Sequence, residues 1–295
     1  NAKRVLAYST IANLGLITAC AGVGTAEAIW AATFLILFHA AAKSLLFLCV
    51  GTAEHHIGSR DIESMDLLFE RMPHLARLMM IGIMCMFIAP LGMLMAKWGA
   101  LVSFAETKNI VLLLILAFGS AATFMFWAKW IGKLAGIAQS TENVEKTVHK
   151  SEWIALLLMT TLIFICCVLM PVISEYIIEP YIASAGIVSV IASQALTDDN
   201  MVIAAILTVL VVIVLIAGPG RSKARKVDVY LAGISVDNEK REFTNALSGV
   251  SAATARNWYL ADWFGEAKLN GFSTIFCTVL IIACFVMSVL SPLGF

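Results

Sequence analysis

Apolar residues along this chain are gathered into long stretches that few polar side chains interrupt. A helix rises about 1.5 Å per residue, so about 20 apolar residues cross the roughly 30 Å hydrocarbon core of a bilayer. Seven stretches meet this requirement, and they predict an all-α polytopic transmembrane helix bundle with seven spans. The predicted spans are residues 5–23, 28–53, 77–104, 110–128, 153–174, 201–217 and 271–292.

The composition supports a membrane protein. Residues of the types AVILMFWYC make up 60% of the chain and DEKR only 14%, and the mean hydropathy is +0.90. Soluble domains average about 45–50% apolar and about 25% charged residues, so a soluble globular enzyme is excluded. The 20 basic and 20 acidic residues cancel, and no net charge favours a nucleic-acid partner.

The basic residues orient the predicted spans, because Lys and Arg collect in the cytoplasmic loops of membrane proteins. With seven spans, Lys108 is the one basic residue between spans that falls on the opposite side. This places the polar segment 218–268 on the cytoplasmic side and the C-terminus outside. The stretch 182–196 is short and rich in Ser and Gly, so we interpret it as an interfacial or re-entrant piece of an outside segment, 175–200.

Two lysines lie inside the predicted spans, Lys43 and Lys97, and no Asp or Glu accompanies them there. A charge at the bilayer centre costs at least about 2.5–3.5 kcal/mol on insertion scales, so such a residue is by default a candidate for function. His39 precedes Lys43 by one helical turn, which puts both side chains on one helix face. Lysine and histidine can take up and release a proton in such surroundings. We therefore interpret His39 and Lys43 as a proton-translocation pair.

The third predicted span contains a helix break. Proline removes a backbone hydrogen bond and clashes with the preceding turn, so Pro90 should interrupt this span near Gly92. Broken helices at membrane depth are tolerated where protein or water covers the freed carbonyls, and they recur at ion sites. Lys97, shortly after the break, is therefore a further candidate, with snorkelling of its side chain to the outer interface as the alternative.

The remaining polar and aromatic groups have simpler interpretations. The seven cysteines lie inside apolar stretches without Cys-x-x-Cys spacing, and free cysteine behaves as a small hydrophobic residue; we expect no metal or cofactor site in this chain. Glu54, His55 and His56 are interpreted as a solvated loop. In the polar segment, Asp237 or Asn238 could cap a helix within 237–266. Three tryptophans at span ends are interpreted as interfacial anchors: Trp127, Trp130 and Trp153.

Three sequence elements together resemble one family. They are KRVLAYSTIANLG at 3–15, FHAAAKSLLFLCVG at 38–51, and the proline-broken helix that ends in lysine. In order and spacing they are similar to the antiporter-like subunits of respiratory complex I, Mrp-type multisubunit Na⁺/H⁺ antiporters and energy-converting membrane-bound hydrogenases. The resemblance implies that Lys43 is the central membrane lysine and His39 its relay partner. It further implies that Lys97 lies near the outward exit and that Lys3, a weaker candidate, marks the inner start of a helix.

The family fold consists of two inverted five-helix repeats. Since the chain starts at Asn1 and enters an apolar span directly, we expect it to be the C-terminal part of a longer protein. The domain organisation that follows is 1–130 as most of the second repeat, 131–217 as two further spans with the outside segment, 218–268 as the polar segment and 269–295 as the C-terminal span. Two positions depart from the family pattern. Leu35 replaces a second histidine, and Trp98 stands where an acidic residue is common.

Residues 229–266 resemble one particular member of this family more specifically. The strings VYLAGISVDNEKREFTNAL at 229–247 and ARNWYLADWFGE at 255–266 are most similar to the large antiporter-like subunit of Ech-type hydrogenases. The resemblance implies a proton- or Na⁺-translocating subunit of a ferredoxin-dependent hydrogenase in a prokaryotic cytoplasmic membrane, with a NiFe centre and iron–sulfur clusters in partner subunits. Two alternatives remain open: a subunit of an Na⁺/H⁺ antiporter without a redox partner, and a non-pumping membrane scaffold whose lysines only pair with partner carboxylates.

Overall fold

The computed structural model describes residues 1–65, 68–87, 92–134, 143–187, 233–235, 242–252 and 265–290, with five single helical residues between 202 and 213. The chain forms two compact units, Asn1–Val229 and Tyr230–Phe295, and each is described by itself. The predicted span 201–217 lies largely outside the described residues, as does most of the stretch 182–196.

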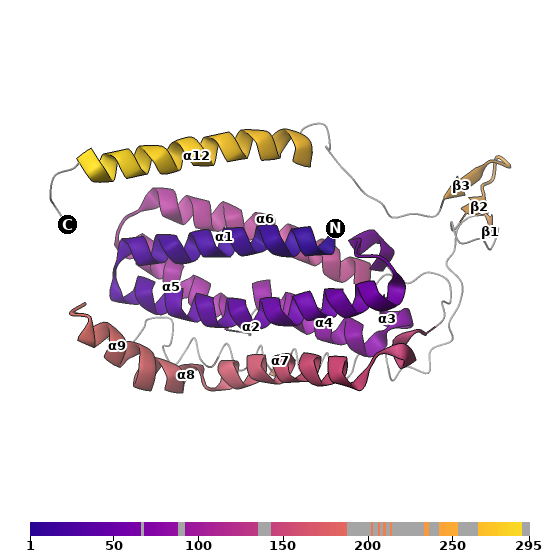
Figure 1. Ribbon diagram of the computed structural model, residues 1–295, viewed down its shortest axis with the longest axis horizontal. Helices are drawn as coiled ribbons and strands as arrows, with labels where there is room; N and C mark the ends of the chain where they lie inside the picture. The colour runs from indigo at the N-terminus through magenta and orange to yellow at the C-terminus, as the bar shows by residue number, and fades with distance from the viewer. Residues whose placement is uncertain are drawn as a thin grey trace. The chain divides into compact units, whose positions relative to one another are not determined.

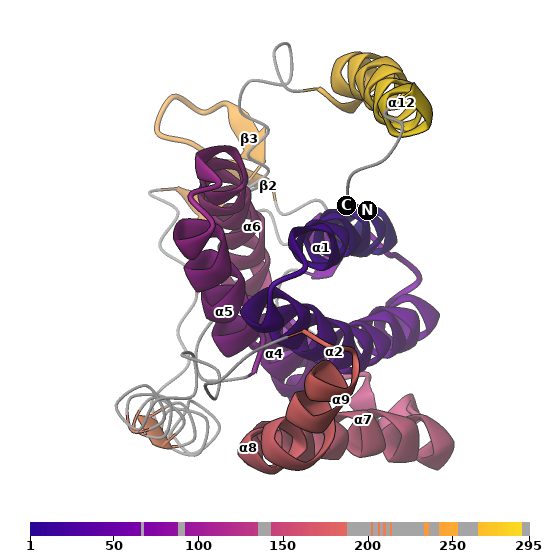
Figure 2. The ribbon, with the colours of Figure 1, turned by 90° about the vertical axis from the view of Figure 1, so that its left-hand side faces the viewer.

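The first unit is a helical bundle (Figures 1 and 2). Its long helices are α1 (Ala2–Val23), α2 (Ala26–Ile57), α4 (Pro73–Phe87), α5 (Met93–Glu106), α6 (Ile110–Leu134) and α7 (Lys150–Val168). Short turns connect or extend them: η1 (Ile62–Met65), α3 (Leu68–Arg71), η2 (Glu145–Thr147), α8 (Met170–Ile173), the π-helical η3 (Ser174–Ile178) and α9 (Glu179–Ser184). The helix after α7 thus continues past the predicted end of the span at 174.

Helix α2 is the centre of this bundle. It packs against α1, α5, α4 and α7, and its buried side chains include the large rings of Trp30, Phe34 and Phe38. A tight connection after α1 turns the chain so that α2 packs back against α1. Gly24 ends α1 in the left-handed conformation with φ 70°, and the Thr25 hydroxyl then accepts the Ala28 amide at 3.2 Å to start α2.

Among the residues that the structure describes, five helices are long and apolar enough to cross a membrane: α1, α2, α6, α7 and Lys268–Met287 within α12. The predicted span 77–104 is interrupted, as expected, because α4 ends at Phe87 and α5 begins at Met93. Pro90 itself lies outside the described residues. Gly92, at the start of α5, has φ 25° and is covered by the Phe38 ring.

The second unit combines a small sheet with the last helix, α12 (Glu266–Leu290). Strands β1 (Ile234–Ser235), β2 (Glu242–Thr244) and β3 (Val250–Ala252) form an antiparallel sheet in the order β1-β2-β3. The prediction of a helix within 237–266 is therefore wrong for residues 242–252. The Asn245 side chain accepts the Leu247 and Gly249 amides, both at 3.0 Å, and this turn directs β3 back along β2.

Candidate functional site

The candidate site lies where α1, α2 and α6 meet. Small residues on α2, Ala41 and Ala42, are buried beside Lys43 and let a neighbouring helix approach closely. Lys43 is only 5% exposed. Its Nζ donates to the Leu6 carbonyl at 3.0 Å and to the Ser9 hydroxyl, both on α1. Lys43 is therefore buried inside the bundle.

An aromatic side chain completes the surroundings of this ammonium. The Lys43 Nζ lies 5.1 Å from the ring centroid of Trp127 on α6. Within the part of the chain that the structure describes, Lys43 forms no ion pair with a carboxylate. A carbonyl, a hydroxyl and an indole face are therefore the groups around the charge.

Helix α1 presents a polar stripe to this site that the sequence analysis missed. The Ser9 hydroxyl donates to the Leu6 carbonyl at 3.0 Å, and Asn13 Nδ2 donates to the Ser9 carbonyl at 2.9 Å. Both side chains are buried. Ser9 and Asn13 are four residues apart, so two polar residues on one face of an apolar span were the available signal. A hydroxyl both donates and accepts, so Ser9 can hydrogen-bond Lys43 with or without its proton.

His39 lies one turn from Lys43 on the same face, as predicted, and is 7% exposed. Neither ring nitrogen has a hydrogen-bond partner among the described residues. The charges of Lys43 and Lys97 both act on the His39 ring, so the structure brings each of these lysines within electrostatic range of His39. Lys97 is half-buried on α5.

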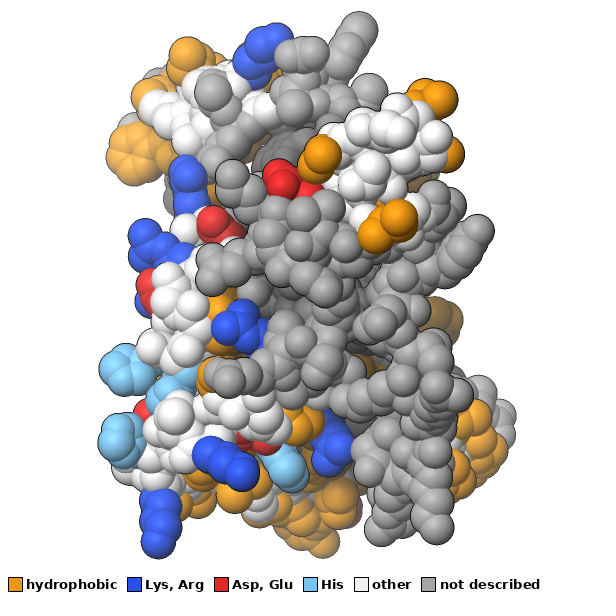
Figure 3. Space-filling view, turned by 90° about the vertical axis from the view of Figure 1, so that its right-hand side faces the viewer, with side chains coloured by type: hydrophobic (Ala, Val, Ile, Leu, Met, Phe, Trp, Pro, Cys, Tyr) orange, Lys and Arg blue, Asp and Glu red, His pale blue; other side chains and the backbone are white. Residues whose placement is uncertain are grey.

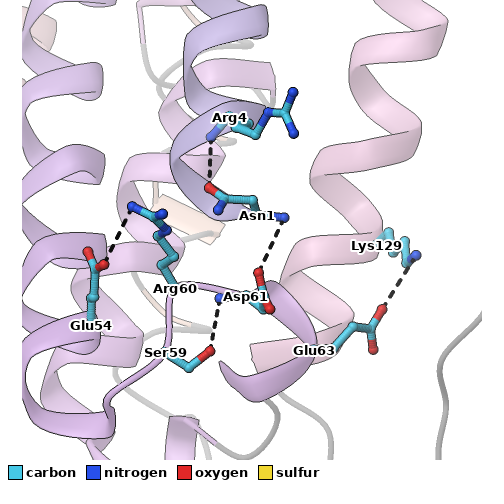
Figure 4. Close-up of polar contacts among 8 residues, drawn as sticks. All are labelled: Asn1, Arg4, Glu54, Ser59, Arg60, Asp61, Glu63 and Lys129. Carbon is cyan, nitrogen blue, oxygen red and sulfur yellow. Dashed lines mark hydrogen bonds and ion pairs between the residues drawn. The ribbon is translucent and has the colours of Figure 1, made fainter. Parts of the chain in front are cut away.

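Lys3 lies apart from these three, at the end of the bundle where α1 begins and α2 ends. Its Nζ is 2.5 Å from Glu54 Oε2, and Arg60 reaches the same carboxylate at 3.8 Å. Figure 4 shows Arg60 and Glu54 with the neighbouring contacts of this end. Basic, acidic and histidine side chains gather there on the surface of the bundle (Figure 3). Lys3 is thus part of a charged terminal layer, one helical turn before Leu6.

Two interpretations of the sequence are corrected. Trp127 and Trp130 are not interfacial anchors: they are 0% and 1% exposed and stack with centroids 5.6 Å apart, because their face of α6 turns toward the bundle. Residues Glu54, His55 and His56 are not a loop, because α2 continues to Ile57 before its Gly58 cap. His56 Nδ1 lies 2.8 Å from the Thr147 hydroxyl.

The positions that depart from the family pattern differ in their surroundings. Leu35 is fully buried on α2, one turn before His39, whereas Trp98 is 46% exposed on α5. Among the described residues, no group of three or more His, Cys, Asp or Glu side chains could hold a metal ion.

The first part of the chain matches a known family. Residues 1–125 match the family described as "NADH:quinone oxidoreductase/Mrp antiporter, TM". Residues 1–125 are an antiporter-like segment of the complex I and Mrp type. This segment contains His39, Lys43 and Lys97 together with the whole of the α1–α2 contact. With several apolar helices, the family match supports a multi-pass membrane protein.

Three relatives show the range of complexes in which similar chains occur. Na⁺/H⁺ antiporter subunit A1 of Staphylococcus saprophyticus is 27% identical over 62% of this chain and 26% of its own length. F420H2 dehydrogenase subunit L of Methanosarcina mazei is 41% identical over 27% of this chain and 12% of its own length. Formate hydrogenlyase subunit 3 of Escherichia coli is 27% identical over 63% of this chain and 34% of its own length. The chain therefore spans about a third or less of the length of these relatives.

Proposed function

We propose that the chain moves protons or Na⁺ across a prokaryotic cytoplasmic membrane as an antiporter-like subunit of a redox-driven complex. The observation that carries this proposal is the Lys43 ammonium, buried at 5% exposure between α1, α2 and α6 without a carboxylate among the described residues. Holding a charge there is costly. A buried ionisable side chain of this kind is expected where its function is to bind and release a proton.

The residues of the site suggest their order of action. Lys43 changes its protonation state when the charge of a neighbouring subunit changes. His39, one turn away, passes the proton on, and its two unbonded ring nitrogens leave it available to do so. Lys97 on α5, beyond the helix break, releases the proton outward. Lys3 belongs to the opposite, charged end, where it contributes to the inner side of the path.

The finer proposal concerns the complex. We infer that α1 to α6 form most of a second antiporter-like repeat, and that the partners are the membrane and peripheral subunits of a ferredoxin-dependent hydrogenase, with a NiFe centre and iron–sulfur clusters in the peripheral ones. The Ech-like tail strings favour this complex. The alternative is an Na⁺/H⁺ antiporter without a redox partner, which the match to a subunit A1 over 62% of the chain favours.

Isolation of the complex separates these possibilities. The tagged full-length protein is purified in mild detergent, its companions are identified by mass spectrometry, and nickel and iron are determined on the same sample. Nickel with iron–sulfur subunits supports the hydrogenase. A metal-free set of small hydrophobic subunits supports the antiporter, and iron with flavin but no nickel supports a relative of complex I.

Two substitutions at Lys43 test translocation itself. Lys43→Met removes the charge and should abolish ion transport in inverted membrane vesicles while the complex still assembles. Lys43→Arg keeps the charge, but a guanidinium does not release its proton in proteins, so transport should also be lost. A scaffold whose lysine only pairs with carboxylates would tolerate arginine. Lys150→Met, at an exposed position of α7, is the matched control, and normal transport by the Lys43→Met complex would overturn the proposal.

A further inference from the structure

The indole of Trp127 is placed as a partner for a cation. Its ring centroid is 5.1 Å from the Lys43 Nζ and the side chain is 0% exposed. A cation within about 6 Å of a tryptophan face is attracted by the ring quadrupole, and more strongly where water is excluded. The contact joins α6 to α2 at the buried Lys43 ammonium.

The contacts of Lys43 differ in their response to its charge. The Leu6 carbonyl accepts a hydrogen bond from an ammonium or from a neutral amine, and the Ser9 hydroxyl can rotate to donate to the neutral form. The ring of Trp127 attracts only the cation. Trp127 therefore favours the protonated state through the charge alone, in addition to the stronger hydrogen bond that the Leu6 carbonyl accepts from an ammonium.

A second buried tryptophan packs beside this ring. Trp130, one turn along α6, stacks on Trp127 with an interplanar angle of 14° and is itself buried. Among the described residues, the Lys43 ammonium makes a cation–π contact with the Trp127 ring and with no other. The two indoles thus share burial and packing, but only one faces the ammonium.

The helices around this contact carry few other titratable groups in their apolar parts. The stretch of α6 from Ile110 to Ala128 has no titratable side chain. Lys129 and Lys133, at the end of α6, contact Glu63. The remaining titratable groups in the apolar parts of α2 and of the long helices packed on it are His39 and Cys49 (α2), Tyr8 and Cys20 (α1), Cys85 (α4), Lys97 (α5), and Cys166 and Cys167 (α7). The short η3 and α9, which also pack on α2, carry Glu175, Tyr176, Glu179 and Tyr181.

We propose that Trp127 is a positioning residue that stabilises the protonated state of Lys43, in the place that a carboxylate would take in an ordinary ion pair. The inference rests on the proposed function, because it assigns Trp127 the task of setting the pH range in which Lys43 exchanges its proton. It adds an aromatic group on α6 to a site otherwise built from α1 and α2.

The test measures the protonation of Lys43 directly. Only the neutral amine reacts with a membrane-permeant isothiocyanate, so the intact complex is labelled at a series of pH values and the Lys43 peptide is quantified by mass spectrometry. In Trp127→Met, the pH of half-maximal labelling should fall by about one unit, the size expected from a desolvated cation–π contact. Trp127→Phe keeps a weaker aromatic face, so its pH of half-maximal labelling should fall by less.

Trp130→Met is the matched control, because it removes an equally buried indole that does not face the ammonium. The pH of half-maximal Lys43 labelling in Trp130→Met should equal that of the wild-type protein. A midpoint unmoved in Trp127→Met, or moved equally in Trp130→Met, would overturn the inference. The labelling does not depend on transport, so wild-type transport by Lys43→Met would refute the proposed function and leave this measurement interpretable.

Discussion

Lys133 on α6 and Glu63 on η1 form an ion pair with Nζ and Oε2 only 2.5 Å apart. Lys129, one turn earlier, reaches the other oxygen of the same carboxylate at 3.7 Å (Figure 4). The Lys133 side chain is 9% exposed and that of Glu63 is 20% exposed, whereas that of Lys129 is 48% exposed. One carboxylate on a short turn thus anchors the end of α6 that also carries Trp127 and Trp130.

Glu63→Gln should lower the thermal unfolding midpoint of the purified protein in detergent. The substitution removes the carboxylate charge that both lysines contact, and losing one partner of a largely buried pair is expected to cost about 2–4 kcal/mol here. Lys129→Gln, at the exposed member, should cost less than about 1 kcal/mol. Equal midpoints for the two variants would show that the short Lys133 contact contributes nothing measurable.

His39→Leu should separate stability from transport. The ring of His39 is buried with both nitrogens unbonded among the described residues, and unpaired buried polar groups are costly. An apolar side chain should therefore leave the unfolding midpoint unchanged or raise it. Transport should fall by roughly a hundredfold, the lower end of what a positioned proton-transfer group contributes. His39→Gln, polar but not titratable, should lose transport equally, and wild-type rates in either variant would contradict the relay.

Gly92→Ala, at the break between α4 and α5, should lower the free energy of unfolding. Gly92 has φ 25°, and a Cβ at this position would overlap the Phe38 ring. Backbone strain and overpacking together should lower the free energy of unfolding by at least about 2 kcal/mol. Urea unfolding in detergent measures this change. Gly119→Ala is the control, since a Cβ there meets nothing within 4 Å and alanine favours a helix. Adding Phe38→Ala should relieve the overlap only, and a Gly92→Ala protein as stable as the control would contradict this account.

Ser174→Ala should weaken the contact between α2 and η3. The Ser174 hydroxyl accepts the Trp30 Nε1 proton at 2.7 Å and donates to Glu179 Oε1 at 2.9 Å. Trp30 and Ser174 are both 1% exposed, so the indole N–H would lose its partner at a cost of about 1–3 kcal/mol. The same substitution in a Trp30→Phe background should cost clearly less, and a double-mutant cycle of thermal unfolding measures the difference. Additive costs would show that the two groups are not coupled.

Much of the fold follows from local features of the chain. Apolar length alone locates α1, α2, α6, α7 and α12, and the pairing of His39 with Lys43 follows from the helical period. The interruption of the 77–104 span also follows from a local steric rule. The sheet in the second unit does not, because its strands are only two or three residues long and pairing between strands outweighs a helix-capping signal.

The sequence by itself determined which helices are long and apolar enough to cross a membrane and which ionisable residues lie within them. The tertiary structure alone decided what surrounds that charge: the Leu6 carbonyl, the Ser9 hydroxyl and the Trp127 ring. It also decided that Lys3 pairs with Glu54 at the charged end. The physical reason is that helix formation depends on hydrogen bonds and side chains within one turn, whereas the partner of a buried group depends on which faces of separate helices meet.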